Sequence, residues 1–254
     1  MTGAERVPLE VLADADAVAR RAARLVAEEA RAAAAARGRF CLAVSGGHTP
    51  WRMLRALAGE PVPWDAVQLF QVDERVAPAG DGDRNWTHID ESLLRRAALP
   101  AANLHPMPVE ERDLDAAAAR YARELERAAG APPVLDLVHL GLGTDGHTAS
   151  LLPGDPALAV ADRDVAVSGV YEGRRRMTLT FPALGRARRI LWLVTGAEKR
   201  AMLARLRAGD GSIPAGRVRS ERARILADPA AAGEPSGGST PCALRSAPTT
   251  RASS

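Results

Sequence analysis

The sequence has very little lysine and very little cysteine. Its 254 residues contain a single lysine, Lys199, and two cysteines, Cys41 and Cys242. Two cysteines provide neither a disulfide framework nor the spacing of a metal site, so a fold stapled by disulfides or zinc is excluded. No set of histidines, aspartates and glutamates has a metal-binding spacing either. We therefore expect no metal.

Long apolar runs and blocks of basic residues are also missing. No run approaches the length that spans a membrane. The arginines are interspersed among acids, and the formal net charge is only +3. Residues 1–17 carry acids early and no apolar stretch of the kind found in secretion signals. We therefore expect a cytoplasmic protein that binds neither membranes nor nucleic acid.

Apolar residues, in contrast, are abundant and occur in a regular pattern. Apolar residues make up 46% of the chain, enough for a sizeable core. Short apolar runs alternate with longer amphipathic or alanine-rich segments, which predicts an α/β fold with a mostly parallel, Rossmann-like sheet and helices on both faces. The predicted strands are 7–12, 40–44, 67–72, 135–142, 165–170, 177–181, 190–194 and, as a final edge strand, 223–226. The predicted helices are 16–37, 50–58, 89–98, 114–129 and 198–208.

The end of the chain has a different composition. From Gly233 the sequence is GEPSGGSTPCALRSAPTTRASS, rich in Ser, Thr, Pro and Gly and without apolar periodicity. Such a segment cannot bury enough apolar surface to offset its ordering entropy. The sequence thus predicts one α/β domain over 1–232 and a disordered tail over 233–254.

Four polar clusters each follow directly on a predicted strand. In open parallel sheets, ligands bind outside the carboxyl ends of the strands. If these strands are parallel, the four clusters face one crevice, and this shared placement is stronger evidence than any single cluster. The clusters are SGGHTP (45–50), DER (73–75), GTDGH (143–147) and TGAEK (195–199).

The first cluster has the features of an anion site. Gly46 and Gly47 allow the backbone to turn tightly and to approach a ligand. Thr49 is a candidate N-cap, followed by a proline suited to the first helical position, and a helix N-terminus attracts phosphate. From the motif alone, an ordinary strand-to-helix turn fits equally well. The similar string SGGSTP at 236–241 has no strand before it and no helix after it, so it is not a candidate.

Charged residues in the other clusters have two interpretations each. Lys199 follows a strand at the start of a helix, where its ammonium can reach a phosphate, although a solvated surface lysine is the alternative. The acids and arginine of 73–75 form either a salt-bridged loop or a site for a polyhydroxy ligand, with Arg75 reaching an anion. In the arginine run 174–176, at least one residue is expected to be solvated.

The GTDGH turn has the residues of a general base. His147 can titrate near neutral pH, and Asp145 can hold the imidazole in one tautomer and stabilise its cation. A capped turn, in which both side chains only satisfy the backbone, remains open from the turn alone. Because the chain has no GxSxG nucleophile pattern, a catalytic role for this turn favours activation of water over a covalent nucleophile.

Seven segments resemble, in order, the motifs of the 6-phosphogluconolactonase family: LAVSGGHTP, QVDERVAP, RNWTHI, LGLGTDGHTASLLPG, RRRMTLTFPAL, VTGAEKRAML and ILADPAAA. The resemblance covers nearly the whole chain up to about Ala232. It implies an α/β fold of the sugar-phosphate isomerase/deaminase type, hydrolysis of 6-phospho-D-glucono-1,5-lactone in the oxidative pentose phosphate pathway, and no organic cofactor. For the oligomeric state, we expect a monomer or a small homo-oligomer.

The resemblance also implies roles for residues. His147 would activate water, with Asp145 beside it. Three positions depart from the family pattern: His48 replaces a frequent serine, Ala77 a usual valine and Arg84 a common serine, and we expect the first and third to touch the pocket. The phosphate would be surrounded by Ser45, Gly46, Gly47, Thr49, Arg176 and Lys199, and the sugar ring would be lined by Asp73, Arg75 and Asn85.

Two rival functions remain. Amino-sugar-phosphate isomerase/deaminases share motifs up to DGH but usually continue IAFNEP, with a glutamate that assists ring opening, whereas this chain reads TASLLP and has Leu152 at that place. A leucine cannot transfer a proton. A non-catalytic sugar-phosphate sensor is the second rival; such regulators usually add a DNA-binding module, and the N-terminal region has no convincing helix-turn-helix.

Overall fold

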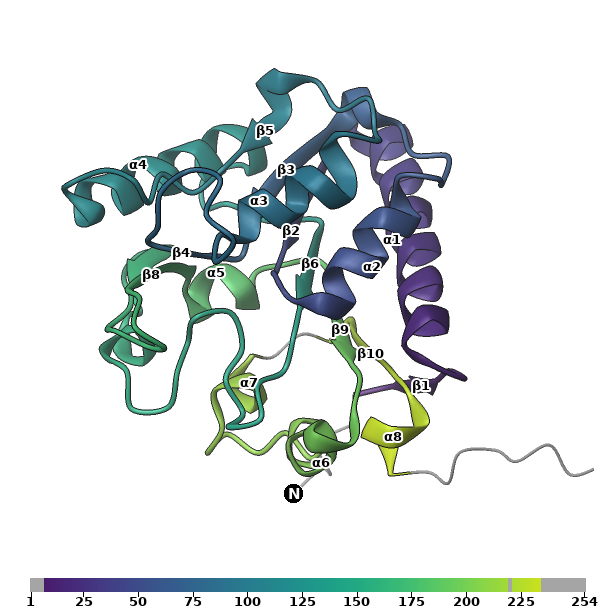
Figure 1. The fold of residues 1–254 in the computed structure, drawn as a ribbon. Coiled ribbons are helices and arrows are strands. Elements are labelled where there is room, and N and C mark those ends of the chain that lie inside the picture. Colours follow the sequence, from purple (N-terminus) through teal and green to yellow (C-terminus); the bar gives the residue numbers. More distant parts are fainter. Residues whose placement is uncertain (1–6, 219–220, 234–254) are drawn as a thin grey trace, which may run out of the picture.

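A computed structural model of the chain describes residues 7–218 and 221–233. Its main sheet has seven parallel strands in the order β1-β10-β9-β6-β2-β3-β5 (Figure 1). The predicted mostly parallel α/β sheet is therefore confirmed. The strands are β1 (Leu9–Val11), β2 (Phe40–Val44), β3 (Val67–Gln71), β5 (Leu104–His105), β6 (Leu137–Leu140), β9 (Ile190–Val194) and β10 (Ala223–Ala227).

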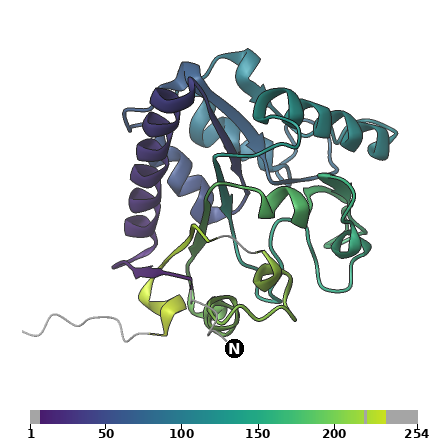
Figure 2. The same ribbon diagram turned by 180° about the vertical axis from the view of Figure 1, so that it is seen from behind.

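Helices cover both faces of this sheet, as Figures 1 and 2 show from opposite sides. On one face lie α1 (Ala15–Arg37), α2 (His48–Leu57) and α3 (Asn85–Ile89). The elements that pack on the other face are α4 (Leu114–Ala129), α5 (Phe181–Gly185), α6 (Arg200–Arg207), α7 (Pro214–Arg217) and α8 (Pro229–Ala232).

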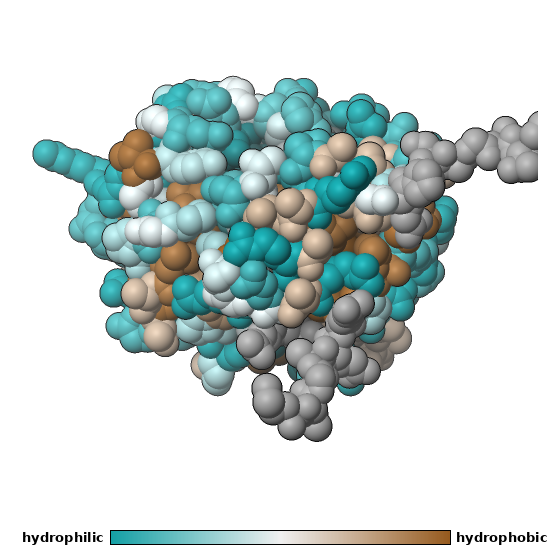
Figure 3. Space-filling model, turned by 90° about the horizontal axis from the view of Figure 1, so that it is seen from below, coloured by the Kyte–Doolittle hydropathy of each residue, from teal (hydrophilic) through white to brown (hydrophobic). Residues whose placement is uncertain are grey.

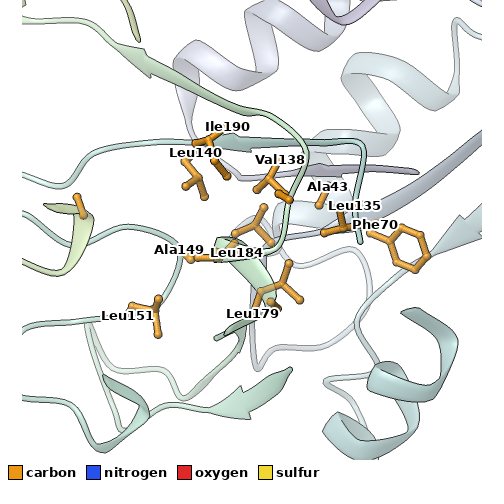
Figure 4. Packing of buried hydrophobic residues seen from close by; sticks show 14 of the residues in the cluster. Ala43, Phe70, Leu135, Val138, Leu140, Ala149, Leu151, Leu179, Leu184 and Ile190 are labelled. Atoms are coloured by element: carbon orange, nitrogen blue, oxygen red, sulfur yellow. The ribbon is translucent and has the colours of Figure 1, made fainter. Parts of the chain in front are cut away.

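The strands are mostly apolar, and β2 and β9 wholly so, because both faces of the sheet are buried. Successive side chains of a strand point to opposite faces. In β2, Phe40 and Leu42 pack in the core beneath α1 and α2, whereas Cys41 and Ala43 pack in the core on the α4 side. Figure 4 shows part of this second core, where side chains of the sheet point toward Leu184 of α5. A five-residue apolar strand such as β2 therefore contributes side chains to both cores.

A second, smaller sheet was not anticipated from the sequence. It is antiparallel, in the order β4-β8-β7, and consists of β4 (Asp73–Arg75), β8 (Arg176–Leu179) and β7 (Val165–Val167). The register of β4 and β8 places Asp73 opposite Thr178 and Arg75 opposite Arg176. Since opposed residues in an antiparallel pair lie side by side, two arginines about a hundred positions apart in the sequence become neighbours.

Two predicted elements were wrong in detail. The segment 223–226 is not an edge strand: β10 lies between β1 and β9, and the edges of the sheet are β1 and β5. The helix predicted over 89–98 begins earlier, as α3 from Asn85, and continues as a π-helical turn over Asp90–Leu94. The early start has a tertiary cause, because a distant carboxylate, that of Glu74, accepts the first N–H groups of the helix.

The predicted division into 1–232 and 233–254 stays a prediction, since residues 234–254 lie outside the described residues. Within 7–218 and 221–233, no helix combines the length and apolarity that crossing a membrane requires. On the face seen in Figure 3, hydrophilic residues predominate and apolar ones lie in small groups among them, an ordinary surface composition.

Candidate active site

One pocket, of about 480 Å³, lies at the carboxyl ends of the central strands. The chain runs outward from β2 through β3 to β5, then returns to place β6 on the other side of β2. This reversal is the switch point at which open α/β sheets bind ligands. All four polar clusters contribute to the pocket wall, as the strand pattern predicts. Of the predicted site residues, Ser45, Gly46, Gly47, Thr49, Asp73, Arg75, Asn85, His147, Arg176 and Lys199 line it.

The loop after β2 is fixed from beneath by His139 of β6. The Ser45 hydroxyl donates to the His139 carbonyl oxygen (3.0 Å), and the Ser45 N–H donates to His139 Nδ1 (3.3 Å). Burial lowers the pKa of His139 to about 3, so its ring is neutral and Nδ1 can accept. His139 is thus a core residue, and it holds the start of the loop in place.

The same loop contacts the end of β9. Thr49 Oγ1 and Thr195 Oγ1 share a hydrogen bond of 2.7 Å. Thr49 is therefore not the N-cap that the sequence predicts: α2 begins at His48, and Gly47 caps it with a φ of 117°. No side chain caps this end, so the first turn of α2 keeps backbone N–H groups available to an anion.

Gly46 and Asn85 meet across the pocket wall. A Cβ atom on Gly46 would overlap Asn85 Oδ1. Any other residue at position 46 would displace this side chain, so the glycine serves the close approach of the two segments. Asn85 is buried; its Nδ2 donates to the Asp73 carbonyl oxygen (3.0 Å), and its Oδ1 has no partner among the described residues. The Asn85 side-chain oxygen is therefore an unused acceptor in the pocket wall.

The Asp-Glu-Arg cluster divides into two functions. Asp73 and Arg75 line the pocket, whereas Glu74 of the same strand is fully buried away from it. Asp73 Oδ2 accepts from the Ser150 hydroxyl (2.6 Å), and Arg75 Nη1 donates to the Asp83 carbonyl oxygen (2.8 Å). The salt-bridged interpretation applies to Glu74, whereas Asp73 and Arg75 line the pocket, and their role as a site for a polyhydroxy ligand stays a prediction.

Glu74 holds together the segments that carry Arg75 and Asn85. Its Oε1 accepts from the N–H groups of Arg75 and Asn85, and Arg84 forms an ion pair with Oε2 (3.1 Å). Arg84 is buried and does not line the pocket, contrary to prediction. Arg84, which stands where the family commonly has serine, supplies a charge partner for Glu74. His48, the other residue expected at the pocket, does line it, as predicted.

The turn after β6 brings an imidazole against a carboxylate. The Gly143 N–H donates to the His147 carbonyl oxygen (2.8 Å) and closes the turn. Asp145 Oδ1 accepts from His147 Nδ1 (2.6 Å) and from the His147 N–H (3.0 Å). Partial burial alone would raise the pKa of Asp145, but the hydrogen bonds and charge of His147 outweigh it and lower that pKa. An ionised carboxylate only accepts, so Nδ1 carries the proton and Nε2 has a free lone pair.

Glycine at position 143 is required by this contact. A Cβ atom there would overlap His147 Nδ1 and lie 2.6 Å from Asp145 Oδ1. A side chain at position 143 would therefore push apart the imidazole and the carboxylate. The predicted catalytic pair is brought together, with His147 in the pocket wall and Asp145 supporting it from outside the lining.

Two residues of the pocket next to His147 were missed by the sequence analysis. Tyr171 lies edge-on to His147, with ring centroids 5.7 Å apart, and the Arg176 guanidinium lies 4.9 Å from the Tyr171 ring centre. The Glu172 carboxylate accepts a hydrogen bond from Arg176 Nη2 at 2.9 Å. Tyr171 and Glu172 precede the Arg174–Arg176 run in a stretch with no motif, so no sequence signal could have found them.

Lys199 lies at the β9 side of the pocket, in a short 3₁₀ turn over Ala197–Lys199. Within the described parts of the chain, no acceptor or acid bonds its ammonium group. Thr195 and Glu198 of the same cluster also line the pocket but were not predicted as site residues. The sequence signal that could have identified Thr195 and Glu198 is their position directly after a predicted strand.

Together these groups form a concave site with an acid–base side and a cationic side. Arg75, Arg176 and Lys199 give the wall three cations. His147 adds a base held in one tautomer. A site of this kind can bind a phosphorylated anion and remove a proton from water near it.

Comparison with known proteins agrees with this geometry. Residues 13–227 match the family model described as "Glucosamine-6-phosphate isomerases/6-phosphogluconolactonase". The chain belongs to this family. It is 39% identical over 202 residues to a 6-phosphogluconolactonase of Synechocystis, covering 78% of this chain and 84% of that one. It is 36% identical over 213 residues to a 6-phosphogluconolactonase of Streptomyces coelicolor, covering 76% and 80%.

Solved structures of the family have the same fold. The 6-phosphogluconolactonase of Thermotoga maritima matches with a TM-score of 0.77 and 27% identity, over 87% of this chain and 98% of that one. A monomeric glucosamine-6-phosphate deaminase matches with a TM-score of 0.78 at 18% identity, over 89% and 99%. The second match shows that the fold extends to the deaminases, so the fold does not distinguish the two chemistries and the site residues must.

Proposed function

We propose that the protein hydrolyses 6-phospho-D-glucono-1,5-lactone to 6-phospho-D-gluconate, in the oxidative pentose phosphate pathway. The observation that carries this proposal is the His147–Asp145 pair at the pocket, with a 2.6 Å hydrogen bond that leaves Nε2 free. The names of the relatives support it, since those with 39% and 36% identity are both 6-phosphogluconolactonases.

In the proposed reaction, His147 Nε2 takes a proton from a water molecule as the water oxygen attacks the lactone carbonyl carbon. Asp145 stabilises the imidazolium that forms. The tetrahedral intermediate then collapses, the bond from carbon to the ring oxygen breaks, and the imidazolium returns its proton to that oxygen. The net change adds one water across one ester bond and leaves the histidine neutral.

The substrate is oriented by its two ends. We assign the phosphate to the loop of Ser45, Gly46, Gly47 and Thr49 together with Arg176 and Lys199. We assign the ring hydroxyls to Asp73, Arg75 and Asn85, whose carboxylate, guanidinium and free amide oxygen supply both acceptors and donors. The oligomeric state, monomer or small homo-oligomer, and the cytoplasmic location remain predictions.

The two rival functions are distinguished from lactone hydrolysis by one residue and by one assay. A deaminase requires a proton-transferring group where Leu152 stands, and Leu152 is a buried apolar side chain. A sensor would bind the phosphosugar without turning it over, which is an outcome of the following assay.

Lactone hydrolysis is tested by generating the lactone in situ with a glucose-6-phosphate dehydrogenase and following its conversion to 6-phosphogluconate. We expect opening of the lactone well above the spontaneous rate, measured in a blank without the protein. Glucosamine 6-phosphate should give no ammonia. Binding of 6-phosphogluconate without acceleration of lactone opening would instead identify a sensor.

Lys199→Ala is expected to weaken binding of 6-phosphogluconate by about tenfold to a hundredfold. A charge-assisted hydrogen bond to phosphate contributes about 1.5–3 kcal/mol. The matched control is Arg200→Ala, which removes the next cation along the chain, one that is exposed and outside the pocket lining. Equal affinities for parent and Lys199→Ala, by calorimetry, would make Lys199 an ordinary surface residue.

A further inference from the structure

Arg176 is a buried cation with one anionic partner. The residue is 4% exposed and lies in the pocket wall. Within the described residues, Glu172 is the acid that pairs with it, accepting from Nη2 at 2.9 Å, while Nε has no partner. A buried guanidinium without a counter-ion is strongly destabilising. When no ligand is bound, Arg176 therefore needs a carboxylate, and the guanidinium still has an unused donor.

Glu172 is placed very differently from its partner. Its side chain is 70% exposed, against 5% for that of Arg176. It stands at the tip of a two-residue turn closed by hydrogen bonds between Tyr171 and Arg174. Its φ of 50° lies in the left-handed region, as the first position of such a turn requires. Exposed side chains change rotamer readily, so this carboxylate can turn out to water while the guanidinium stays fixed.

The base of the turn is anchored independently of Glu172. Arg174 Nη2 contacts Asp83 Oδ2 at 2.8 Å and Asp81 Oδ2 at 3.2 Å, which connects the turn to the loop before α3. The departure of the Glu172 side chain therefore does not require the turn itself to move, and the carboxylate stays within reach of Arg176 for its return.

We propose that Glu172 is an internal competitor for the phosphate subsite: it pairs with Arg176 when no ligand is bound and is displaced when the phosphate of a ligand takes its place. This inference rests on the proposed function, which assigns Arg176 to the phosphate. A phosphate carries more charge than a carboxylate and more acceptor oxygens, so it can engage the guanidinium more strongly than Glu172 does through Nη2 alone. Glu172 lines the same pocket and would be repelled by the incoming anion.

The consequence of this exchange is weaker retention of product. The product 6-phosphogluconate keeps the phosphate of the lactone and gains a carboxylate, so a strongly cationic site would hold it firmly. A carboxylate that returns to Arg176 lowers the affinity for every phosphorylated ligand and favours release, a step that often limits turnover.

The test is calorimetric titration of Glu172→Gln with 6-phosphogluconate and with inorganic phosphate. Glutamine keeps the size of the side chain and removes the competing charge. We expect both ligands to bind about three- to tenfold more tightly than to the parent, with an equal fall in the product inhibition constant. Gluconate, which has no phosphate, should show no gain.

Two controls separate competition at Arg176 from a general charge effect. Glu198→Gln removes another carboxylate of the pocket that has no bond to Arg176, and its effect on phosphate affinity should be smaller. In an Arg176→Gln background, Glu172→Gln should give no gain. Unchanged or weaker phosphate binding by Glu172→Gln would overturn the inference, because Glu172 would then only hold Arg176 in position. If the parent itself bound no phosphosugar, the proposed function would fail instead.

Discussion

His147→Asn is expected to reduce kcat for lactone hydrolysis by about 10²–10⁴, the usual contribution of a positioned general base. The fold should be preserved, because His147 lies half-buried on a pocket turn and not in either core. Affinity for 6-phosphogluconate should also be retained, since the phosphate is assigned to groups elsewhere in the pocket. The measurement is kcat for the folded variant, after subtraction of uncatalysed lactone opening.

Asp145→Asn is the matched variant for the same turn. It keeps the imidazole but removes the acceptor that fixes Nδ1–H and the charge that stabilises the imidazolium. We expect a smaller loss of kcat than for His147→Asn, because the base remains. The pKa of Asp145 is lowered, so its carboxylate is ionised at neutral pH and Asp145→Asn removes a charged partner of the imidazole.

Near-parental turnover of His147→Asn would exclude this residue as the base. Asp73, whose carboxylate lines the pocket, would then be the next candidate for the general base. Glu74 would not be a candidate, because it is fully buried outside the lining and its oxygens accept hydrogen bonds from surrounding N–H groups.

The location of the site was predictable from local sequence. Strands buried on both faces appear as continuous apolar runs, and the polar residues that follow them collect at one edge once the strands are parallel. This is why Ser45, His147 and Lys199, from three different strand ends, could be assigned to one pocket by sequence pattern alone. The turn chemistry of Gly143 and Asp145 is likewise local, since these residues act on a histidine within four positions.

What could not be predicted depends on register between distant segments. Arg75 and Arg176 become neighbours only through the pairing of β4 with β8. Tyr171 and Glu172 join the site only because that second sheet carries their turn to His147 and Arg176. The start of α3 at Asn85 depends on Glu74, eleven positions earlier. No periodicity or spacing in the sequence encodes these contacts, because each is decided by how two separate chain segments dock.

Glu74→Gln is expected to lower the free energy of unfolding by about 3–5 kcal/mol, the usual effect of breaking a buried ion pair by removing one partner. The amide would leave the buried Arg84 with only the more distant and exposed carboxylate of Glu110, at 3.9 Å, as a counter-ion. Its NH₂ group would also face N–H donors where the carboxylate now accepts. The groups that donate to Glu74 are Gln71 Nε2 and the backbone N–H groups of Arg75, Asn85 and Trp86.

The measurement is urea unfolding of the parent and of the variant, with Glu91→Gln as the control, since that glutamate is on the surface and should change stability by less than about 0.5 kcal/mol. Arg84→Leu combined with Glu74→Gln should be less destabilising than the sum of the two single changes, because neither charge is then left unpaired.

Glu74→Gln should also affect the active site. Because Glu74 holds the N–H of Asn85 and of Arg75, its replacement should raise KM for the lactone at temperatures where the variant is still folded. A loss below about 1 kcal/mol, with additive double-variant energies, would mean that water or neighbouring groups compensate Arg84 and that α3 begins at Asn85 for another reason.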